Sequence, residues 1–492
     1  MRSSLAQLAA ALTGARLING AGSGSGSGAE PDVAFDGVST DSRAQLTGAL
    51  FVALRGEHFD GHDFLAQLPA KGAAAVIAEQ LPPGWTLPAI VVPNTLTALG
   101  QAGNFWRARF AIPVIGVTGS NGKTTVKEMI AAILAQAHGE DGRLATRGNL
   151  NNEIGVPLTL MRLLPAHRAA VVELGMNHPG EIARLAAIAA PTIGMVNNAQ
   201  REHQEFMHTV EAVALENGAV LAALPLDGIA VYPGDDVYTP LWQGLAGQRR
   251  SITFGLDGTN DAAGGSNGSN VSCSHRAEAF GSTLEVTACI NGNGEGEGQD
   301  ALQFSLRLAA PGLHNVRNAL AAIACALAAG VDPDAIVRGL EAFAPVSGRL
   351  QCKTAPNGAT VIDDSYNANP DSVRAAIDVL DKAPQPRILV LGDMGEVGTQ
   401  GQQFHEEIGA YAASCGVDTV LVTGELTRHM VGTGARHFDQ LDALLSALDG
   451  ALDTTLSNTS DATVLVKGSR FMKMERVVQH LLGSPHTGKE IH

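Results

Sequence analysis

Residues 112–128, IPVIGVTGSNGKTTVKE, decide the fold of this chain. They begin with an apolar, β-branched run at 112–117, which predicts a buried strand. A glycine-rich turn at 119–122 and Lys123-Thr124-Thr125 follow, and apolar residues then recur at helical spacing over 126–134. A strand, a glycine loop, a Lys-Thr pair and a helix, in this order, are the context that a phosphate-binding loop requires.

This loop has the chemistry to hold a triphosphate. Glycines let backbone N–H groups crowd around an anion, and the new helix presents its unpaired N-terminal donors to it. Lys123 then reaches the terminal phosphates, and the Thr124 hydroxyl ligates Mg²⁺. The strict consensus has glycine where Val117 stands, so an ordinary strand–helix turn with a chance lysine is the alternative. The residues expected to bind ATP here are Thr118, Gly119, Ser120, Asn121, Gly122, Lys123, Thr124 and Thr125.

The composition of the chain limits its class. Its 492 residues predict two to four domains, each with its own core. The formal charge of −16 argues against a nucleic-acid partner, because nucleic-acid binders normally present a basic face. Five scattered cysteines without a CxxC pair indicate neither a disulfide framework nor a zinc site, and no apolar run is long enough to span a membrane. We therefore expect a soluble, cytoplasmic monomer with no membrane span.

The alternation of strand-like and helical segments predicts an α/β protein of three domains with largely parallel sheets. Residues 1–92 predict a small N-terminal α/β domain, and residues 93–344 a central P-loop-type parallel-sheet ATPase domain. Residues 345–492 predict a C-terminal Rossmann-like αβα domain, without the GxGxxG motif of a dinucleotide site. The strands expected in the first domain lie near 50–54, 74–78 and 89–92.

Polar side chains follow three strands of the predicted central sheet. The strand at 169–174 ends with Glu173, and the strand at 193–196 leads to His203. Ligands of open α/β sheets bind beyond the carboxyl ends of the strands, so Thr124, Glu173 and His203 are expected to meet there. A hydroxyl, a carboxylate and an imidazole form a partial shell for Mg²⁺, although histidine is an unusual ligand for so hard an ion. The alternative is that Glu173 and His203 are ordinary polar residues at strand ends.

Two further loops carry candidate binding residues. Asp41, Ser42 and Arg43 combine a carboxylate, a hydroxyl and a guanidinium, which can bind a polar ligand carrying phosphate or uracil. Three asparagines within 149–152 suit a loop that hydrogen-bonds a ligand. For both loops the alternative is a solvated turn rich in turn-forming residues. The Gly/Asn/Ser-rich segment 257–300 predicts a peripheral hairpin with long loops and no function.

Nine short strings over nearly the whole chain resemble those of the Mur ligase family, in the family's order. The most specific are DDSYNANPDS (363–372) and GNLNNEIGVP (148–157), whereas the phosphate loop also fits the wider superfamily. The others are TDSR (40–43), GVTGSNGKTT (116–125), ELGMN (173–177), HNVRNALAA (314–322), GRL (348–350), LGDMGEVG (391–398) and LVKGSRFMKME (465–475).

The resemblance implies three domains that bind a UDP-linked substrate, ATP and an incoming amino component in turn. It implies an ATP- and Mg²⁺-dependent ligation of D-alanyl-D-alanine to UDP-MurNAc-tripeptide through an acyl phosphate, in peptidoglycan synthesis. Catalysis then rests on charge neutralisation and positioning, because a carboxylate must approach a triphosphate. The sequence does not distinguish diaminopimelate from lysine as the third residue of the stem peptide.

The resemblance also implies roles for individual residues. Lys123 neutralises the phosphates, and Thr124, Glu173 and His203 hold Mg²⁺; Lys123, Glu173 and His203 are therefore the expected catalytic residues. The residues expected around the nucleotide, besides the phosphate loop, are Asn315, Asn318, Arg349 and Asp364. The residues expected to bind the other substrates are Asp41, Ser42 and Arg43 for the UDP moiety, Asn149, Asn151 and Asn152 for the sugar or peptide, and Asn367, Asn369 and Lys467 for D-Ala-D-Ala.

One position departs from the family. In the family, a lysine that is carbamylated and supports a second Mg²⁺ usually follows the histidine, and Asn217 stands in its place here. An amide carries no charge, so a second Mg²⁺ either is held otherwise, through Glu216 or Glu205, or binds more weakly.

The alternatives to this ligase are a folylpolyglutamate synthase-like ligase, a P-loop kinase and a non-enzymatic, ATP-gated binding protein.

Overall fold

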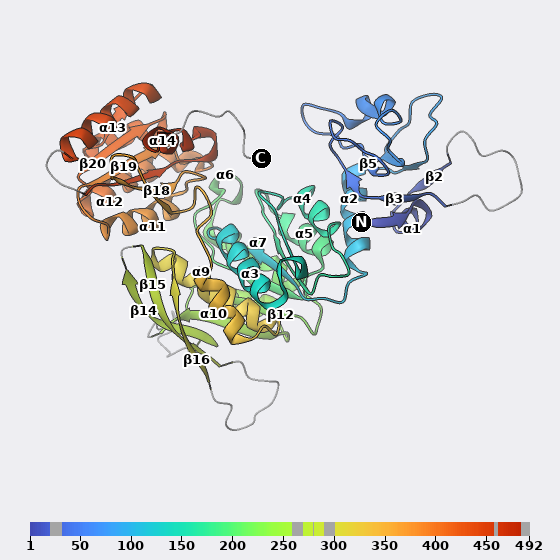
Figure 1. The fold of residues 1–492 in the computed structure, drawn as a ribbon, viewed down its shortest axis with the longest axis horizontal. Helices are drawn as coiled ribbons and strands as arrows, with labels where there is room; N and C mark the ends of the chain where they lie inside the picture. The colour runs from blue at the N-terminus through green and yellow to red at the C-terminus, as the bar shows by residue number, and fades with distance from the viewer. Residues whose placement is uncertain (20–31, 258–268, 279, 290–300, 457–460, 484–492) are drawn as a thin grey trace, which may run out of the picture.

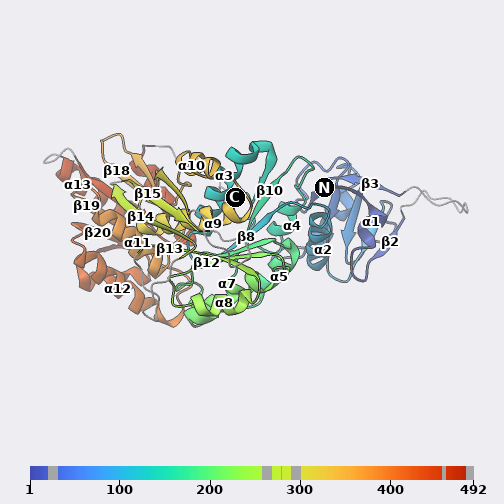
Figure 2. The same cartoon turned by 90° about the horizontal axis from the view of Figure 1, so that it is seen from below.

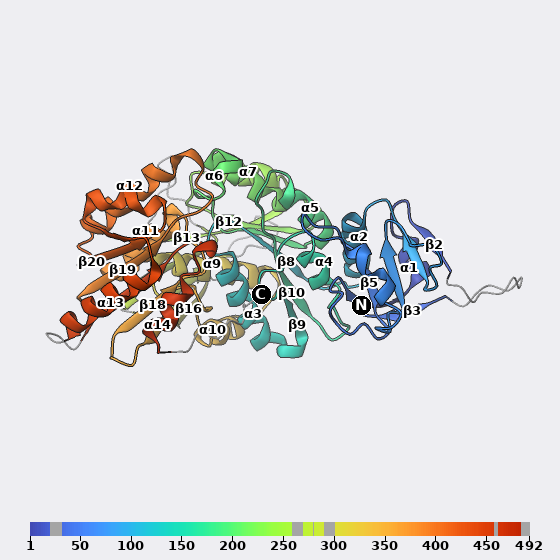
Figure 3. The same cartoon turned by 90° about the horizontal axis from the view of Figure 1, so that it is seen from above.

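The computed structural model describes residues 1–19, 32–257, 269–278, 280–289, 301–456 and 461–483. Figure 1 shows three bodies along the chain, coloured blue, teal to yellow, and orange to red. Figures 2 and 3 agree that the first and third bodies lie at opposite ends, with the central body between them. Each body is built on its own sheet, which confirms the predicted three-domain α/β class. Among the described helices, none is long and apolar enough to cross a membrane.

The first body contains a five-stranded sheet in the order β2-β7-β6-β5-β4. Its strands are parallel except β2, which runs antiparallel to β7. The three predicted strands are present as β5, β6 and β7. The elements of this body are β1 (Arg2–Ser4), α1 (Leu5–Ala9), β2 (Arg16–Ile18), β3 (Ala34–Asp36), β4 (Val38–Ser39), β5 (Leu50–Val52), η1 (Gly61–Gln67), β6 (Ala75–Ala78) and β7 (Ala89–Val91).

Helix α2 (Thr95–Arg107) joins the first body to the second. The side chain of Asn94 caps it by accepting a hydrogen bond from the Thr97 N–H at 2.8 Å. On one side Leu99 packs in the same core as Leu50 of the first sheet. On the other side α2 contacts α4 (Gly155–Leu160) and α5 (Glu181–Ala189) of the central body. Because α2 packs against both bodies, the domain limit between residues 92 and 93 stays a prediction.

The central body contains a nine-stranded sheet in the order β16-β15-β14-β13-β12-β11-β8-β10-β9. From β9 to β14 neighbouring strands are parallel, and both faces are covered, so the strands read as apolar runs. Helices α3 and α9 pack on one face, and α5 and α7 on the other. The bounds of these elements are β8 (Val114–Thr118), α3 (Lys123–His138), η2 (Glu140–Gly142), β9 (Arg143–Ala145), β10 (Ala169–Glu173), β11 (Ile193–Val196), α6 (Gln204–Met207), α7 (Val210–Ala222), β12 (Ile229–Pro233), α8 (Thr239–Ala246), β13 (Arg250–Leu256), α9 (Leu313–Ala328) and α10 (Pro333–Glu341).

The edge of the central sheet differs from the prediction of a peripheral hairpin at 257–300. Strands β14 (Val271–Glu278), β15 (Gly281–Ala288) and β16 (Leu302–Leu308) extend the sheet, and β14 was not predicted as a strand. Apolar side chains such as Leu284 and Leu306 are buried in the same core as α3 and α9. The three strands are therefore part of the central core, and the long loops of the prediction lie largely outside the described residues.

The third body contains a six-stranded sheet in the order β17-β18-β22-β19-β20-β21. All pairs are parallel except β17 with β18, and α11 and α12 cover one face while α13 and α14 cover the other. This confirms the Rossmann-like αβα prediction, although β21 was not predicted. The bounds are β17 (Gln351–Thr354), β18 (Thr360–Asp364), α11 (Pro370–Asp381), β19 (Arg387–Gly392), η3 (Gly398–Gln400), α12 (Gly401–Ser414), β20 (Thr419–Thr423), η4 (Leu426–Thr433), β21 (Arg436–Phe438), α13 (Leu441–Leu456), β22 (Thr463–Lys467), η5 (Arg470–Met472) and α14 (Glu475–Leu481).

Candidate active site at the phosphate loop

The predicted phosphate loop connects β8, which lies between β10 and β11 in the central sheet, to the start of α3. Gly119 and Gly122 have φ values of +132° and +81°, which side chains other than glycine rarely adopt. A Cβ atom at Gly122 would lie 2.4 Å from Asn318 Oδ1 and 2.6 Å from Asn197 Nδ2. The loop therefore needs glycine at this position for both its conformation and its surroundings.

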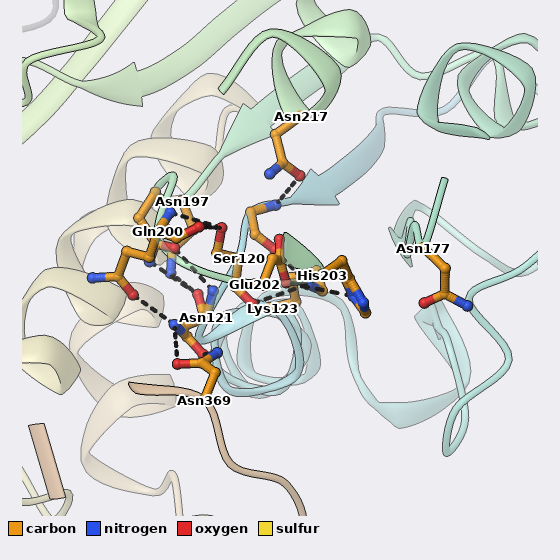
Figure 4. Close-up of polar contacts among 12 residues, drawn as sticks. Ser120, Asn121, Lys123, Asn177, Asn197, Gln200, Glu202, His203, Asn217 and Asn369 are labelled. Atoms are coloured by element: carbon orange, nitrogen blue, oxygen red, sulfur yellow. Dashed lines mark hydrogen bonds and ion pairs between the residues drawn. The ribbon is translucent and has the colours of Figure 1, made fainter. Parts of the chain in front are cut away.

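Side chains from the segment after β11 hold the loop in place (Figure 4). Asn197 Nδ2 donates to the Asn121 carbonyl oxygen and to Asn318 Oδ1, both at 2.8 Å. The Asn121 N–H donates to Asn198 Oδ1 at 2.9 Å, and the Gln200 N–H donates to Ser120 Oγ at 2.9 Å. The contacts span 76 to 121 residues of sequence, so segments far apart in the chain fix the shape of the loop. Spacing along the chain gave no signal for these partners.

Lys123 begins α3 and turns back over the loop. Its Nζ donates to the carbonyl oxygen of Gly119, to that of Ser120 at 3.1 Å, and to Glu202 Oε2 at 3.3 Å. Glu202 is only 6% exposed, so its carboxylate is an effective counter-charge for the lysine. The prediction did not include Glu202. Its position at a strand end, directly before His203, was the available signal.

Thr124 and Glu173 meet beneath the loop as predicted for a metal site. Thr124 Oγ1 donates to Glu173 Oε1 at 3.3 Å, and Asn151 Nδ2 donates to the same oxygen at 2.9 Å. Glu173 is 2% exposed, and its Oε2 atom is buried without a hydrogen-bond partner. A free carboxylate oxygen beside a hydroxyl suits Mg²⁺, which takes one or two protein oxygens and completes its octahedron with water and phosphate.

Acidic and imidazole side chains do not converge on a complete metal cage. In the part of the chain that the structure describes, no three His, Cys, Asp or Glu side chains are placed to hold a metal ion together. The residues present therefore fit a Mg²⁺ ion that shares its coordination with a bound triphosphate, and they do not fit a metal held by protein ligands alone.

His203 faces the third body instead of the Thr124–Glu173 pair. Its backbone is left-handed, with φ at +46°, and its Nδ1 lies 2.7 Å from Glu396 Oε2 while its Nε2 lies 3.8 Å from Glu202 Oε2. The adjacent His203 imidazole holds the pKa of the Glu396 carboxyl below its ordinary value. The role of His203 as a metal ligand stays a prediction.

The start of α11 in the third body touches the phosphate loop. Asn369 Nδ2 donates to Asn121 Oδ1 at 2.9 Å, across 248 residues of sequence. The side chain of Asn369 also caps α11, since its Oδ1 accepts from the Ser372 N–H at 2.8 Å. Residues predicted for ATP and for D-Ala-D-Ala are therefore in direct contact.

Other third-body candidates surround a buried ion pair. Lys467 Nζ donates to Asp364 Oδ2 at 2.5 Å and to the Asn367 carbonyl oxygen at 2.9 Å. Burial raises the pKa of the Asp364 carboxyl, and Lys467 opposes that shift. The Arg349 guanidinium lies 4.4 Å from the centre of the Tyr366 ring. These residues form one group close to the start of α11.

The asparagines predicted near the nucleotide base support the loop in this structure. Asn318 Nδ2 donates to Asn315 Oδ1 at 3.1 Å, and Asn315 Nδ2 donates to the Pro311 carbonyl oxygen at 2.7 Å. Nearby, His314 is half-buried, and burial together with the charge of Lys467 lowers its pKa to about 4. Contact of Asn315 and Asn318 with a base stays a prediction.

The candidates for the UDP moiety and for the sugar or peptide lie outside this cluster, except Asn151. Asp41 pairs with Arg43, whose Nε lies 2.9 Å from Asp41 Oδ1, and this pairing lowers the pKa of the Asp41 carboxyl. The Ser42 carbonyl oxygen accepts from the Lys71 ammonium. Asn152 Oδ1 accepts from the Gly155 N–H at 2.9 Å and stabilises a turn, while Asn149 is exposed. Binding of substrate by these residues stays a prediction.

The Asn217 side chain supports the phosphate loop in this structure. Its Oδ1 accepts from the Gly119 N–H at 2.9 Å, while its Nδ2 is buried without a partner. Glu216, offered above as an alternative metal ligand, is occupied, because its two oxygens accept from the N–H groups of Gly180 and Ile182 at 2.8 Å. Glu205 is exposed on α6, and the holding of a second Mg²⁺ by Glu216 or Glu205 stays a prediction.

The chain belongs to the Mur ligase family, since three family models and a relative that spans nearly its whole length match it. The models are the Mur ligase family catalytic domain at residues 34–106, the Mur ligase middle domain at 117–326, and the Mur ligase glutamate ligase domain at 348–470. The relative is the UDP-N-acetylmuramoyl-tripeptide–D-alanyl-D-alanine ligase of Escherichia coli (strain K12), which is 37% identical over 454 residues, covering 92% of this chain and 94% of that protein.

Solved structures give the same result. The crystal structure of MurF from Acinetobacter baumannii matches with a TM-score of 0.85 at 32% identity, covering 98% of this chain and 99% of that one. The MurF ligase of Thermotoga maritima in complex with ADP matches with a TM-score of 0.76 at 25% identity, covering 91% and 97%. The likeness thus extends through all three bodies.

Proposed function

We propose that this chain joins D-alanyl-D-alanine to UDP-N-acetylmuramoyl-tripeptide, using ATP and releasing ADP and phosphate. The observation that carries the proposal is the reach of the likeness, because the Escherichia coli relative named for this reaction matches 92% of the chain. A folylpolyglutamate synthase-like ligase would share the ATP-binding loop but would not be expected to carry TDSR (40–43) or DDSYNANPDS (363–372). A P-loop kinase would not be expected to match through the first and third bodies. Those alternatives are therefore not favoured.

The reaction proceeds in two steps. The terminal carboxylate of the tripeptide attacks the γ-phosphorus of ATP, which forms an acyl phosphate and releases ADP. The amine of D-Ala-D-Ala then attacks the acyl carbon, the C–N bond forms, the C–O bond to phosphate breaks, and the amine proton leaves to solvent or a nearby base. The first step brings a carboxylate up to a triphosphate, and the second builds negative charge on the acyl oxygen and the departing phosphate. Both steps therefore need charge neutralisation and positioning more than covalent help from the protein.

The chain's own groups supply that neutralisation. Lys123 places a positive charge at the loop, and in this structure its Nζ donates to Glu202 and to two loop carbonyl groups. Helix α3 begins without a side-chain cap, so its first N–H groups remain available for phosphate oxygens. Arrival of the triphosphate exchanges the contacts of Lys123 with the protein for contacts with the γ-phosphate.

Thr124 and Glu173 would hold Mg²⁺ against the phosphates. The free Glu173 Oε2 and the adjacent hydroxyl are the oxygens that support this assignment. When bound, the ion withdraws charge from the transferring phosphoryl group. His203 and the second metal of the family are not needed for this assignment.

We assign each of the remaining substrates to one of the other two bodies. We place the UDP moiety on the first body at Asp41, Ser42 and Arg43, and the D-Ala-D-Ala at the third body near Asn367, Asn369 and Lys467. The contact between Asn369 and Asn121 supports a single reaction site between the second and third bodies. The proposal carries with it a cytoplasmic monomer that serves cell-wall synthesis, and thereby cell shape and division.

The test is phosphate release from ATP with UDP-MurNAc-tripeptide, measured with and without D-Ala-D-Ala. The proposal expects sustained release only when both are present, together with a product whose mass equals that of UDP-MurNAc-pentapeptide. A kinase would transfer the phosphoryl group without releasing phosphate, and a folylpolyglutamate synthase would respond to folate and glutamate instead. A non-enzymatic binding protein would release no phosphate with any of these substrates.

A further inference from the structure

The segment of residues 197–203, which follows β11, contacts two bodies at once. Its side chains at 197, 198 and 200 hold the phosphate loop. Its next residue, Arg201, reaches the third body. Arg201 therefore lies within four residues of each of the side chains that hold the loop.

Arg201 makes a dense set of contacts across the two bodies. Its backbone N–H donates to Asp371 Oδ2 at 2.8 Å, and its Nη2 and Nε donate to Asp371 Oδ1 at 2.6 and 3.1 Å. Its Nη1 donates to Glu407 Oε2 at 3.0 Å, and the guanidinium lies 5.1 Å from the centre of the Phe404 ring. Charge-assisted, forked contacts of this kind are stronger and more directional than ordinary hydrogen bonds.

Both carboxylates belong to the third body and are tied to its helices. Asp371 lies in the first turn of α11 and Glu407 on α12, and Arg374 of α11 donates to Glu407 Oε1 at 3.0 Å. The Arg201 and Asp371 side chains are 24% and 23% exposed, so solvent screens the pair less than it screens a surface pair. The contact joins groups 170 residues apart in sequence.

The ion pair between Arg201 and Asp371 lies close to the contact between the third body and the phosphate loop. Asp371 is two residues from Asn369, which caps α11 and donates to Asn121 of the phosphate loop. The start of α11 is thus fixed to the central body at two points on one helical turn. Release of Arg201 would leave the contact between Asn369 and Asn121 as the main polar link at this turn.

We propose that Arg201 is a positioning residue, which docks the start of α11 on the phosphate loop and keeps the ATP site and the third-body substrate site in register. The effect on ligation rests on the function proposed above, whereas the effect on the arrangement of the bodies does not. Arg201 touches no reacting atom in this account and acts through Asp371 and Asn369.

The first test is structural and needs no substrate. Small-angle X-ray scattering of the full chain is compared for the wild type, Arg201→Ala, Asp371→Ala and the double variant. We expect a larger radius of gyration for each single variant and no further increase for the double variant. The matched control is Arg428→Ala, which breaks an ion pair with Asp439 that is exposed and internal to the third body. Scattering curves for Arg201→Ala that match those of the wild type would overturn the proposal.

The second test separates positioning from binding. For Arg201→Ala we expect kcat/KM for D-Ala-D-Ala to fall about tenfold, while the Kd for ATP stays within about twofold of wild type. The losses of Arg201→Ala and Asp371→Ala should not add in the variant that carries both. Arg201→Lys should recover part of the loss, because it keeps the charge without the forked geometry. Additive losses, or a loss equal to that of Arg428→Ala, would contradict the proposal.

Circular dichroism checks that each variant is folded, and Asp371→Asn replaces Asp371→Ala if the alanine variant is not. If the wild type ligates no D-Ala-D-Ala, the proposed function is wrong, while the scattering comparison still decides whether Arg201 docks the third body.

Discussion

The phosphate loop and the Asp41–Arg43 turn are both predicted to bind phosphate-bearing groups, yet the structure holds them in opposite ways. The loop is fixed by side chains from the segment after β11, from α9 and from α11 of the third body. Asp41 and Arg43 are paired with each other, and the Arg43 side chain is 88% exposed. One site is built before its ligand arrives, whereas the other offers groups that are free to rearrange.

Because of this difference, we expect the two sites to contribute differently to the rate of the reaction and to the binding of substrate. A loop fixed in advance can stabilise charge that develops during reaction, because its dipoles need no reorganisation. The attraction within an exposed ion pair is weak, so a ligand can separate the two side chains at small cost. Contacts that are equally strong before and during the reaction contribute to substrate affinity and little to the rate of the chemical step. Substitutions at the loop should therefore change kcat, and substitutions at the turn should change the binding of the UDP-linked substrate.

The largest effect is expected for Lys123→Ala. Removing the charge that faces the γ-phosphate should lower kcat about a hundredfold to a thousandfold or more. It also leaves the buried Glu202 without its cation, at a cost of about 1–3 kcal/mol in the free energy of unfolding. The measurement is steady-state phosphate release at saturating ATP, alongside urea denaturation.

The control for this substitution is Lys123→Ala combined with Glu202→Gln. The second change removes the unpaired charge, so stability should return while activity should not. Near-wild-type turnover of Lys123→Ala would remove the distinction between the two sites, because it would show that the loop does not act on the reacting phosphate.

A smaller effect is expected for Glu173→Gln, which keeps the shape of the side chain and removes its charge. The Mg²⁺ concentration for half-maximal binding of ATP should rise about 10-fold to 100-fold, because a carboxylate ligand is replaced by a neutral amide. Calorimetric titration of ATP at several Mg²⁺ concentrations measures this shift. Thr124→Ser, which keeps the hydroxyl, should change it little, and an unchanged Mg²⁺ dependence in Glu173→Gln would contradict the metal assignment.

Two substitutions of Asn369 divide its two contacts. Asn369→Asp keeps the oxygen that caps α11 and accepts from Asn121 Nδ2 at 3.4 Å, and it loses the amide that donates to Asn121 Oδ1 at 2.9 Å. Ligation should therefore fall about tenfold with stability unchanged. Asn369→Ala loses both contacts and should also lower the free energy of unfolding by about 1 kcal/mol. Calorimetry should show unaltered binding of the UDP-linked substrate in both, and a loss there would contradict the division of substrates between the bodies.

The smallest effect is expected for Arg43→Ala in the exposed turn. The KM for the UDP-linked substrate should rise about tenfold while kcat stays unchanged, since the contact serves binding alone. Stability should stay within about 0.5 kcal/mol of wild type, because the residue is exposed. A fall in kcat with unchanged KM would show that the first body takes part in the chemical step.

The sequence was sufficient for the parts that local pattern determines. The apolar run at 112–117 became the central strand β8, and Gly122 adopts the backbone that a glycine permits. Glu173 falls at a strand end beside Thr124, as the strand-end argument predicts. The three bodies follow from the same alternation of strands and helices.

The rest depended on contacts between segments far apart in the chain. Glu202 as the partner of Lys123, and Arg201 as the link to Asp371, join groups whose spacing carries no periodic signal. Strand β14 was not predicted because most of its residues are polar, and only Val271 and Cys273 of it are buried in the core. His203 turned towards Glu396 because a left-handed backbone redirects its ring, which strand-end reasoning does not predict.

The central claim is that the loop activates a carboxylate as an acyl phosphate before the amine attacks. It is tested most directly by labelling the terminal carboxylate oxygens of UDP-MurNAc-tripeptide with oxygen-18 and analysing the phosphate released during ligation by mass spectrometry. If the account is correct, each phosphate released carries one labelled oxygen, because the carboxylate oxygen leaves with the phosphoryl group. Unlabelled phosphate accompanied by ligated product would contradict the account.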